Sequence, residues 1–187
     1  MEYIFVSKNK NKFDEAREIL KQFGIPLSVA TTEKKVEIQD KSLENIVDYA
    51  LSQLDPKPDK CFIIEDDGIF IKVLNGFPGP YAAQFYATIG LEGILKLMQG
   101  KSDRSAFFKS AVGVLMPNGE KHIFTGVTRG SIAKSIAKGR EFGYDPIFVP
   151  KGSRVTFAEM NIQDKSKISH RGKAFSKLGR FLKKTVK

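Results

Sequence analysis

The stretch FFKSAVGVLMPNGEKHIFTGVTR, residues 107–129, decides the fold class of this 187-residue chain. Residues 107–116 and 121–129 are rich in β-branched and aromatic side chains, which favour strands. The Pro-Asn-Gly sequence at 117–119 between them is a turn signal that joins antiparallel strands. The sequence therefore predicts a β-hairpin here, and any sheet that contains it includes an antiparallel pair.

Helices and strands alternate on both sides of this hairpin. Short apolar runs predict strands at 2–6, 61–65, 69–74 and 147–149, with an acidic turn between the second and third and a loop at 75–80. Apolar spacing predicts helices at 12–23, from Ser42 to Leu54, at 91–98 and from about Ser169 into the 180s. This order predicts an α/β protein with a mixed, twisted sheet flanked by helices, in one domain over residues 1–187.

Bulk composition places the chain among ordinary globular proteins. Hydrophobic residues make up 41% and charged residues 28% of the sequence, close to average usage. No apolar run approaches the roughly 20 residues that a membrane helix needs, and the N-terminus lacks a signal-peptide pattern. The single cysteine, Cys61, cannot form an internal disulfide and fits a buried strand. We therefore expect a cytoplasmic protein with no membrane partner.

Charge is distributed unevenly along the chain. The formal net charge is +10, and basic proteins attract polyanions such as nucleic acid or phosphorylated metabolites. A solvated helix face is the simpler explanation for the last part of the chain. From position 165 onward there is no acid but there are nine basic residues, which are Lys165, Lys167, Arg171, Lys173, Lys177, Arg180, Lys183, Lys184 and Lys187.

The segment Ser7-Lys8-Asn9-Lys10-Asn11-Lys12 follows the first predicted strand and opens the first predicted helix. Backbone N–H groups and the helix dipole favour anions at such a position, and the lysines add positive charge. The segment lacks the P-loop pattern, and a polar loop with solvated lysines explains its composition equally well. It is a candidate phosphate-binding loop.

Three acids in a row, Glu65-Asp66-Asp67, follow the apolar residues CFII and precede Gly68. Clustered carboxylates repel one another unless a cation neutralises them, and oxygen ligands favour a hard cation such as Mg²⁺. An acidic turn is the simpler alternative, because Asp-Gly is a common turn dipeptide. Glu37, which lies between apolar residues in VEIQD, is a candidate third ligand for the same metal.

Two later segments carry groups suited to a nucleobase. Phe142-Gly143-Tyr144-Asp145 combines aromatic rings with a carboxylate that can accept hydrogen bonds, although a strand-entry turn also explains it. In the segment that begins at Lys165, Ser169 is a candidate N-cap, which places His170 and Arg171 in the first helical turn. Basic groups there oppose the helix dipole unless an anion is present, whereas a surface histidine is the simpler alternative for His170.

These segments, in this order, resemble the inosine triphosphate pyrophosphatase family, also called the Ham1-like family. The most specific pieces are NGFPGPY at 75–81, FGYDP at 142–146, TFAEM at 156–160 and SHRGKA at 169–174, and the resemblance covers nearly the whole chain. It implies a two-lobed Ham1/Maf-like domain with a central cleft, a homodimer, and Mg²⁺-dependent hydrolysis of ITP, dITP and XTP to the monophosphate and pyrophosphate. It also implies a role in cleansing the nucleotide pool.

The resemblance implies roles for individual residues. Residues 7–12 match the family's phosphate loop, and Glu37 matches a metal-binding glutamate. Asp66 matches the carboxylate assigned to metal binding and general base, with Glu65 beside it as a further metal ligand. The remaining nucleotide contacts that it implies are Asp67, Phe142, Gly143, Tyr144, Asp145, Lys165, His170 and Arg171.

Three positions depart from the family pattern. Lys8 stands where the family loop often has glycine. Asp67 stands where many members have a small hydroxyl residue that touches the substrate. Tyr81 is followed by Ala-Ala-Gln, where many members carry a basic residue. These departures affect groups that would contact phosphate.

The resulting hypothesis is a hydrolase in which Asp66 orients or deprotonates a water that attacks the α-phosphorus, while Mg²⁺ and Lys12 neutralise the departing pyrophosphate. Donors such as His170 and Arg171 would favour a 6-oxopurine over adenine. One alternative is a non-catalytic nucleic-acid- or nucleotide-binding protein that uses the basic C-terminal face. The acidic cluster disfavours it by repelling a polyanion, so no stable nucleic-acid partner is expected. A second alternative is a pyrophosphatase of modified pyrimidine or methylated nucleotides.

Overall fold

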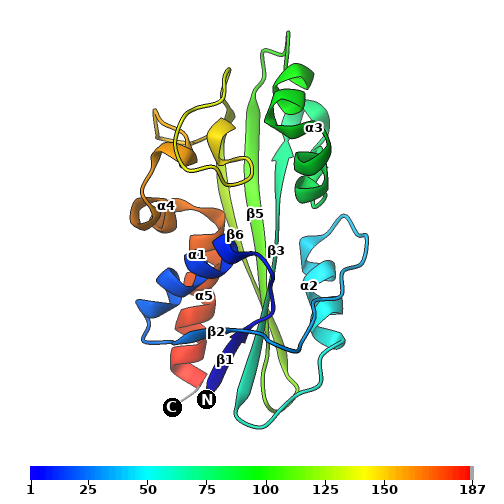
Figure 1. Ribbon diagram of the computed structural model, residues 1–187, viewed down its shortest axis with the longest axis vertical. Coiled ribbons are helices and arrows are strands. Elements are labelled where there is room, and N and C mark those ends of the chain that lie inside the picture. Colours follow the sequence, from blue (N-terminus) through cyan, green and yellow to red (C-terminus); the bar gives the residue numbers. More distant parts are fainter. Residues whose placement is uncertain (186–187) are drawn as a thin grey trace.

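A single mixed sheet is the framework of the protein. The computed structural model in Figure 1 describes residues 1–185, so Lys187 of the basic tail lies outside the described residues. In this part of the chain the strands run in the order β2-β1-β3-β5-β6-β7, with β4 paired to β3. The pairs among β2, β1 and β3 are parallel, and all other pairs are antiparallel. The strands are β1 (Glu2–Phe5), β2 (Leu27–Val29), β3 (Lys60–Ile71), β4 (Pro78–Gly79), β5 (Ser105–Leu115), β6 (Lys121–Ile132) and β7 (Phe148–Pro150).

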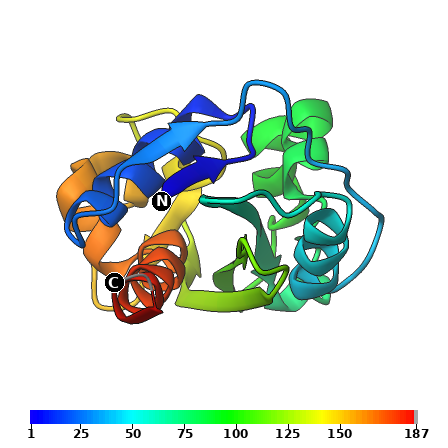
Figure 2. The same cartoon turned by 90° about the horizontal axis from the view of Figure 1, so that it is seen from below.

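Helices cover both faces of this sheet, which confirms the predicted α/β class with a mixed sheet. Figures 1 and 2 show α1, α4 and α5 on one side, and α2 and α3 on the other. Among the helices of the described residues, none combines the length and apolar character needed to span a bilayer. The helices are α1 (Lys10–Lys21), α2 (Leu43–Ser52), α3 (Ala82–Leu97), α4 (Ile162–Ile168) and α5 (His170–Thr185).

Strand alternation produces two hydrophobic cores, one on each face of the half of the sheet that is lower in Figure 1. Phe5 of β1 and Ile63 of β3 are buried against α1 and α5, whereas Ile4 and Phe62 are buried against α2. Successive side chains of a strand point to opposite faces, so strands covered on both sides are apolar throughout. A third core lies in the upper half, where Ile69 and neighbouring side chains pack against α3.

The acidic run lies in β3 between the lower and upper cores, and the prediction of an acidic turn there is wrong. Glu65, Asp66 and Asp67 continue the strand and pair with residues 110–112 of β5. Gly68 is needed for a close approach and not for a turn, because a Cβ atom there would lie 2.3 Å from the carbonyl oxygen of Gly79. The acids are therefore held rigidly in the sheet.

The turn and the helix N-caps that the sequence predicted most clearly are present in the structure. The predicted hairpin is β5–β6, with Gly119 at φ +87° in its turn. Ser42 caps α2 by accepting a hydrogen bond from the N–H of Asn45. Ser169 caps α5 in the same way, because its hydroxyl accepts a bond from the N–H of Gly172.

Other boundaries differ from the prediction for identifiable reasons. The first helix begins at Lys10 because Asn9 caps it. The helix predicted at 91–98 extends back to Ala82, with Gly90 at φ 64° and ψ −170° interrupting it. The predicted strand at 147–149 is β7, one residue later. Neither β2 nor α4 was predicted, since three and seven residues are too few for a clear periodic pattern.

The close packing of α5 on β6 predicts that Gly126→Ala destabilises the protein. An added Cβ atom would lie 2.0 Å from the carbonyl oxygen of His170, so the start of α5 must shift. We expect a loss of about 2 kcal/mol in the free energy of unfolding, measured by urea denaturation. The neighbouring exposed Val127→Ala should cost about 0.5 kcal/mol or less. Equal losses in the two variants would contradict the tight contact.

Candidate functional site

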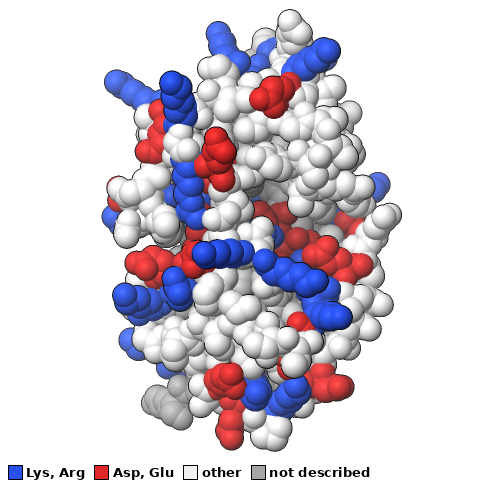
Figure 3. Space-filling model, viewed as in Figure 1, with Lys and Arg blue, Asp and Glu red and all other residues white. Residues whose placement is uncertain are grey.

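A cleft of about 1080 Å³ opens where β3 passes between the lower and upper cores. Figure 3 shows this hollow at mid-height, with acidic side chains inside it and basic side chains along its rim. Segments far apart in the sequence form its wall. They are the loop after β1, the loop between β2 and α2, the centre of β3, the start of α3, residues 141–145 and the first turn of α5.

Most of the residues predicted for the site meet in this cleft. Two do not line it: Lys10, which is exposed on α1, and Lys165, which is buried behind the wall. The predicted residues that line it are Ser7, Lys8, Asn9, Asn11, Lys12, Glu37, Glu65, Asp66, Asp67, Phe142, Gly143, Tyr144, Asp145, His170 and Arg171.

The guanidinium of Arg171 lies at the centre of an ion-pair network and is only 1% exposed. Its Nε donates to Glu65 Oε1 at 2.8 Å, and its Nη1 donates to Glu15 Oε2 at 2.6 Å. Its Nη2 lies 3.2 Å from Asp67 Oδ2. Burial alone would lower the pKa of Arg171, but these carboxylates raise it well above its ordinary value. Arg171 is therefore a permanent buried cation.

Glu15 on α1 is the acceptor that joins this network, through Lys165, to the segment at residues 142–145. Besides Arg171, it accepts hydrogen bonds from Lys165 Nζ at 2.8 Å and Arg140 Nη1 at 3.2 Å. Burial opposes its ionisation, but Arg171 and Lys165 outweigh burial and lower the pKa of Glu15 to about 2. Lys165 also forms a close ion pair with Asp145, whose pKa burial raises to about 6 despite that partner.

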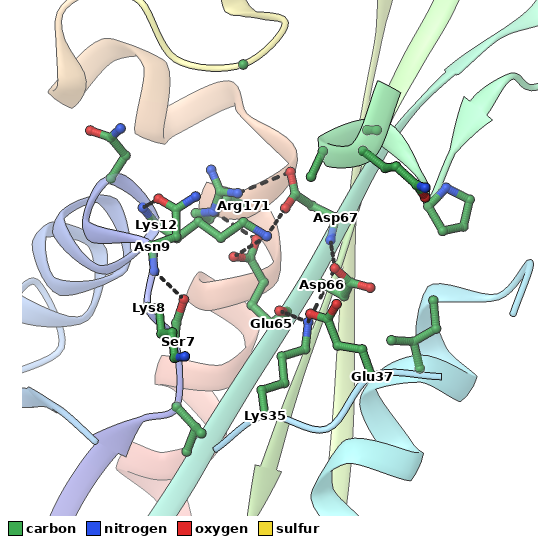
Figure 4. Close-up of a pocket in the computed structure, with 18 of the residues that line it drawn as sticks. Ser7, Lys8, Asn9, Lys12, Lys35, Glu37, Glu65, Asp66, Asp67 and Arg171 are labelled. Atoms are coloured by element: carbon green, nitrogen blue, oxygen red, sulfur yellow. Dashed lines mark hydrogen bonds and ion pairs between the residues drawn. The ribbon is translucent and has the colours of Figure 1, made fainter. Parts of the chain in front are cut away.

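Lys12 reaches into the cleft from the first turn of α1 (Figure 4). The side chain of Asn9 accepts a bond from the N–H of Lys12 at 3.1 Å, and the hydroxyl of Ser7 accepts one from the N–H of Asn9 at 3.2 Å. The Lys12 ammonium pairs closely with Asp67 and lies 3.8 Å from Glu65 Oε2. Burial opposes the charge of Lys12, but these carboxylates raise its pKa. Ser7 and Asn9 thus fix the start of α1, from which Lys12 points into the cleft.

Asp66 lies on the opposite face of β3 from Glu65 and Asp67, as strand alternation requires. There the ammonium of Lys35 lies 3.4 Å from Asp66 Oδ1 and 2.7 Å from Glu37 Oε1, and it donates to the carbonyl oxygen of Glu65 at 3.0 Å. Burial raises the pKa of Asp66, although Lys35 and Lys12 oppose the shift. The three predicted metal ligands therefore do not converge, since Arg171 holds the Glu65 carboxylate on the other side.

Two carboxylates on this side of β3, Glu37 and Asp66, lie close enough to one cation to hold a metal ion together. Among the described residues, no three His, Cys, Asp or Glu side chains are grouped closely enough to hold a metal. Glu37 and Asp66 nevertheless share one cation, the ammonium of Lys35. Mg²⁺ is usually held by one or two carboxylates together with waters and substrate phosphates. This pair therefore fits a metal that arrives with a phosphorylated ligand.

Aromatic rings form the other end of the cleft. The Phe142 ring faces three cations, with Lys165 at 5.1 Å, Arg171 at 5.5 Å and Arg140 at 5.8 Å from its centroid. The Tyr144 hydroxyl donates to the carbonyl oxygen of Ala82 at 2.9 Å, so this residue links the nucleobase segment to α3. The rings are therefore fixed before any ligand binds.

His170 stacks on Phe108, with ring centroids 4.4 Å apart and planes 7° from parallel. Burial lowers its pKa, so the ring is neutral at pH 7. Neither ring nitrogen has a hydrogen-bond partner among the described residues, and the same holds for Arg171 Nη2 and Glu65 Oε2. Buried polar atoms without partners are costly, and at a cleft they point to a ligand that satisfies them. His170 is thus not the surface histidine of the simpler alternative.

Three charged groups of the ion pairs at the cleft, Glu15, Lys35 and Arg140, were not predicted. Glu15 carried a weak signal, because it lies next to Ala16 on the apolar stripe of the first helix. Its partners are 125 to 156 residues away in the sequence. Lys35 carried no signal, since it stands in a polar loop.

Part of the basic C-terminal segment is occupied by contacts within the protein. Lys165 and Arg171 are buried in the ion-pair network. Lys173 donates to the carbonyl oxygen of Val127, and Lys177 donates to that of Thr125. These contacts leave fewer free cations on α5 than the sequence suggested, which disfavours a polyanion-binding face.

The fold and the site together define an α/β protein with a deep, charged ligand-binding cleft and not a flat binding surface. A family model described as the Ham1 family matches residues 3–181, and the chain belongs to that family.

Comparisons with individual proteins agree with this family membership. A Pyrococcus horikoshii protein described as a dITP/XTP pyrophosphatase is 46% identical over 187 residues, covering 100% of both chains. One from Methanopyrus kandleri with the same description is 43% identical, covering 100% of this chain and 98% of the other. The solved structure of a HAM1 protein from Coxiella burnetii is similar with a TM-score of 0.85 and 26% identity, covering 99% of this chain and 100% of that one.

The Glu15 network predicts a pH-dependent contribution to stability. Glu15→Gln should lower the free energy of unfolding at pH 7 by about 3 kcal/mol, because it leaves buried cations uncompensated. The folded-state pKa is about 2 and the ordinary value is 4.5, so the stabilisation is full above pH 4.5 and is lost as pH falls toward 2. Urea denaturation of both proteins should therefore show curves that converge in acid.

Asp14→Asn is the matched control for this experiment. Asp14 lies one residue away on α1 and pairs with Arg17 on the surface at 3.1 Å. Surface pairs contribute about 1 kcal/mol or less, so this variant should differ little from the wild type at any pH. A Glu15→Gln variant that is as stable as Asp14→Asn at pH 7 would show that the network does not stabilise the fold.

Proposed function

We propose that this protein hydrolyses non-standard purine nucleoside triphosphates, namely ITP, dITP and XTP, to the monophosphate and pyrophosphate. The observation that carries the proposal is the set of buried polar atoms without hydrogen bonds at a cleft that also holds Lys12 and the carboxylate pair of Glu37 and Asp66. The descriptions of the relatives from Pyrococcus horikoshii and Methanopyrus kandleri support it. Such an activity would cleanse the nucleotide pool.

The proposed cofactor is Mg²⁺, held by Glu37 and Asp66 together with phosphate oxygens. Lys35 supports this assignment, because its ammonium already stands between the two carboxylates as a cation. Bound there, the ion would neutralise phosphate charge and orient the triphosphate chain. Glu65, the third ligand expected from the sequence, has instead a supporting role, since Arg171 and the hydroxyl of Ser110 hold its Oε1.

In the proposed reaction, a water attacks the α-phosphorus and its proton passes to a carboxylate oxygen of Asp66. A new P–O bond forms to the water oxygen, and the bond between the α-phosphorus and the α–β bridging oxygen breaks. The electron pair leaves with pyrophosphate, whose charge Lys12 neutralises. The raised pKa of Asp66 suits it to accept a proton.

Base selectivity is assigned to the donors at the aromatic end of the cleft. Arg171 Nη2 is a buried donor that makes an ion-pair contact with Asp67 but no hydrogen bond within the described residues, and His170 lies beside it in the chain. A 6-oxo group would satisfy a donor, whereas the exocyclic amine of adenine would leave both groups unpaired. Phe142 would stack on the base while its other neighbours hold its orientation.

The homodimer and the cytoplasmic location implied by the resemblance belong to this proposal. The alternative of a non-catalytic nucleic-acid-binding protein is not favoured. Its basic face is partly used in contacts with β6, and the relatives are described as pyrophosphatases.

A nucleotide panel tests the proposed function directly. With Mg²⁺ present, kcat/KM for ITP and XTP should exceed that for dATP by about 10²-fold or more, because adenine leaves buried donors unpaired. Pyrophosphate, and not single phosphate, should appear in the product. Equal rates on ITP, XTP, dATP and dGTP would contradict the selective pocket, and no pyrophosphate from any nucleotide would contradict the function.

The assigned base predicts the effect of Asp66→Asn. Removing the proton acceptor should lower kcat by about 10²- to 10⁴-fold while the circular dichroism spectrum and melting temperature stay close to wild type. Asp164→Asn, which alters an exposed pair with Lys167, is the matched control and should keep full turnover. Turnover retained by Asp66→Asn would assign the base to another group.

A further inference from the structure

Asp67 differs from the other carboxylates of the cleft because it faces three proposed nucleotide contacts at once. It pairs closely with Lys12, lies 3.2 Å from Arg171 Nη2 and lies 3.6 Å from His170 Nε2. Figure 4 shows its side chain pointing toward Lys12 and Arg171 from the centre of β3. A carboxylate is therefore placed against the positive groups that a phosphate chain would use.

The neighbouring carboxylates are anchored more firmly than Asp67. Glu15 accepts bonds from Arg171, Lys165 and Arg140, and its side chain is 3% exposed. Glu65 accepts bonds from Arg171 and the hydroxyl of Ser110, and its side chain is 0% exposed. The side chain of Asp67 is 17% exposed, and within residues 1–185 its charged partners are Lys12 and Arg171, with the neutral ring of His170 beside them. Asp67 is the carboxylate at the edge of the network that an incoming anion meets first.

We infer that Asp67 is an internal counter-ion, which a polyphosphate must displace from Lys12 and Arg171 in order to bind. Two anions that compete for the same cations weaken each other's binding, and the repulsion is strong where water is partly excluded. Asp67 thereby lowers the affinity of the cleft for pyrophosphate and speeds its departure. This inference rests on the proposed function for the identity of the anion.

The variant Asp67→Asn removes the charge with little change of shape. The backbone pairing of this position with Ser110 in β5 does not depend on the carboxylate. Arg171 keeps Glu15 and Glu65, so it is not left as an unpaired buried cation. Lys12 keeps Glu65 at 3.8 Å but becomes free to bind a second anion.

The test is calorimetric titration of the full chain with inorganic pyrophosphate, without and with Mg²⁺. Asp67→Asn should bind pyrophosphate about tenfold more tightly than the wild type, which corresponds to about 1.4 kcal/mol. Pyrophosphate should inhibit hydrolysis of ITP by this variant at a correspondingly lower concentration. The control Asp14→Asn, whose charge lies outside the cleft, should match the wild type in both measurements. Melting curves confirm that each variant is folded.

Equal or weaker binding by folded Asp67→Asn would overturn the inference. Weaker binding would show instead that Asp67 positions Lys12 and Arg171 for the ligand. Absence of pyrophosphate binding in both proteins would also overturn it. Hydrolysis of ITP by the wild type tests the proposed function separately. If the wild type hydrolyses ITP but the pyrophosphate affinities contradict the inference, only the inference fails. If the wild type neither hydrolyses ITP nor binds pyrophosphate, both the inference and the proposed function fail.

Discussion

The buried guanidinium of Arg171 connects three elements that are distant in the sequence. It contacts Glu15 on α1, and Glu65 and Asp67 on β3, from the first turn of α5. A buried charge is tolerated only when it is paired and hydrogen-bonded, so each partner must stay in place for the others to remain stable. The relative positions of α1, α5 and β3 therefore depend on ion pairs at the cleft as well as on the apolar core below it.

Strand alternation then gives the cleft two chemically different sides. Glu65 and Asp67 meet Arg171 and Lys12 on one face of β3, whereas Asp66 meets Lys35 on the other. A turn at this point would have scattered the three carboxylates. Because β3 pairs with β5 along its whole central part, the acids keep fixed directions at the place where the lower and upper cores end. The same feature separates the proposed metal side from the proposed phosphate and base side.

Local signals made the hairpin, the cap at Ser42 and the class of the fold predictable from the sequence. The acidic run was misread because the difference between a turn glycine and a packing glycine at Gly68 depends on Gly79, a contact between two strands. In the site, Lys12 and Arg171 were found through their chemistry and the resemblance. Glu15 was missed because only the tertiary fold brings its partners close to it. A single acidic residue on a helix carries no sequence pattern that identifies such distant partners.

The cleft is almost self-neutralised before any ligand is present, and this determines how a ligand can bind. Lys35 stands between Glu37 and Asp66, while Lys12 and Arg171 stand against carboxylates of β3. Binding of a metal-bound phosphate chain is therefore an exchange of one set of ion pairs for another, and the net gain is smaller than the new contacts alone suggest. Groups that make no hydrogen bond within the described residues, such as His170 Nδ1, lose little when a ligand arrives. In such a site, charge exchange holds the phosphate chain only moderately, and the unpaired atoms at the base end contribute most of the discrimination between ligands.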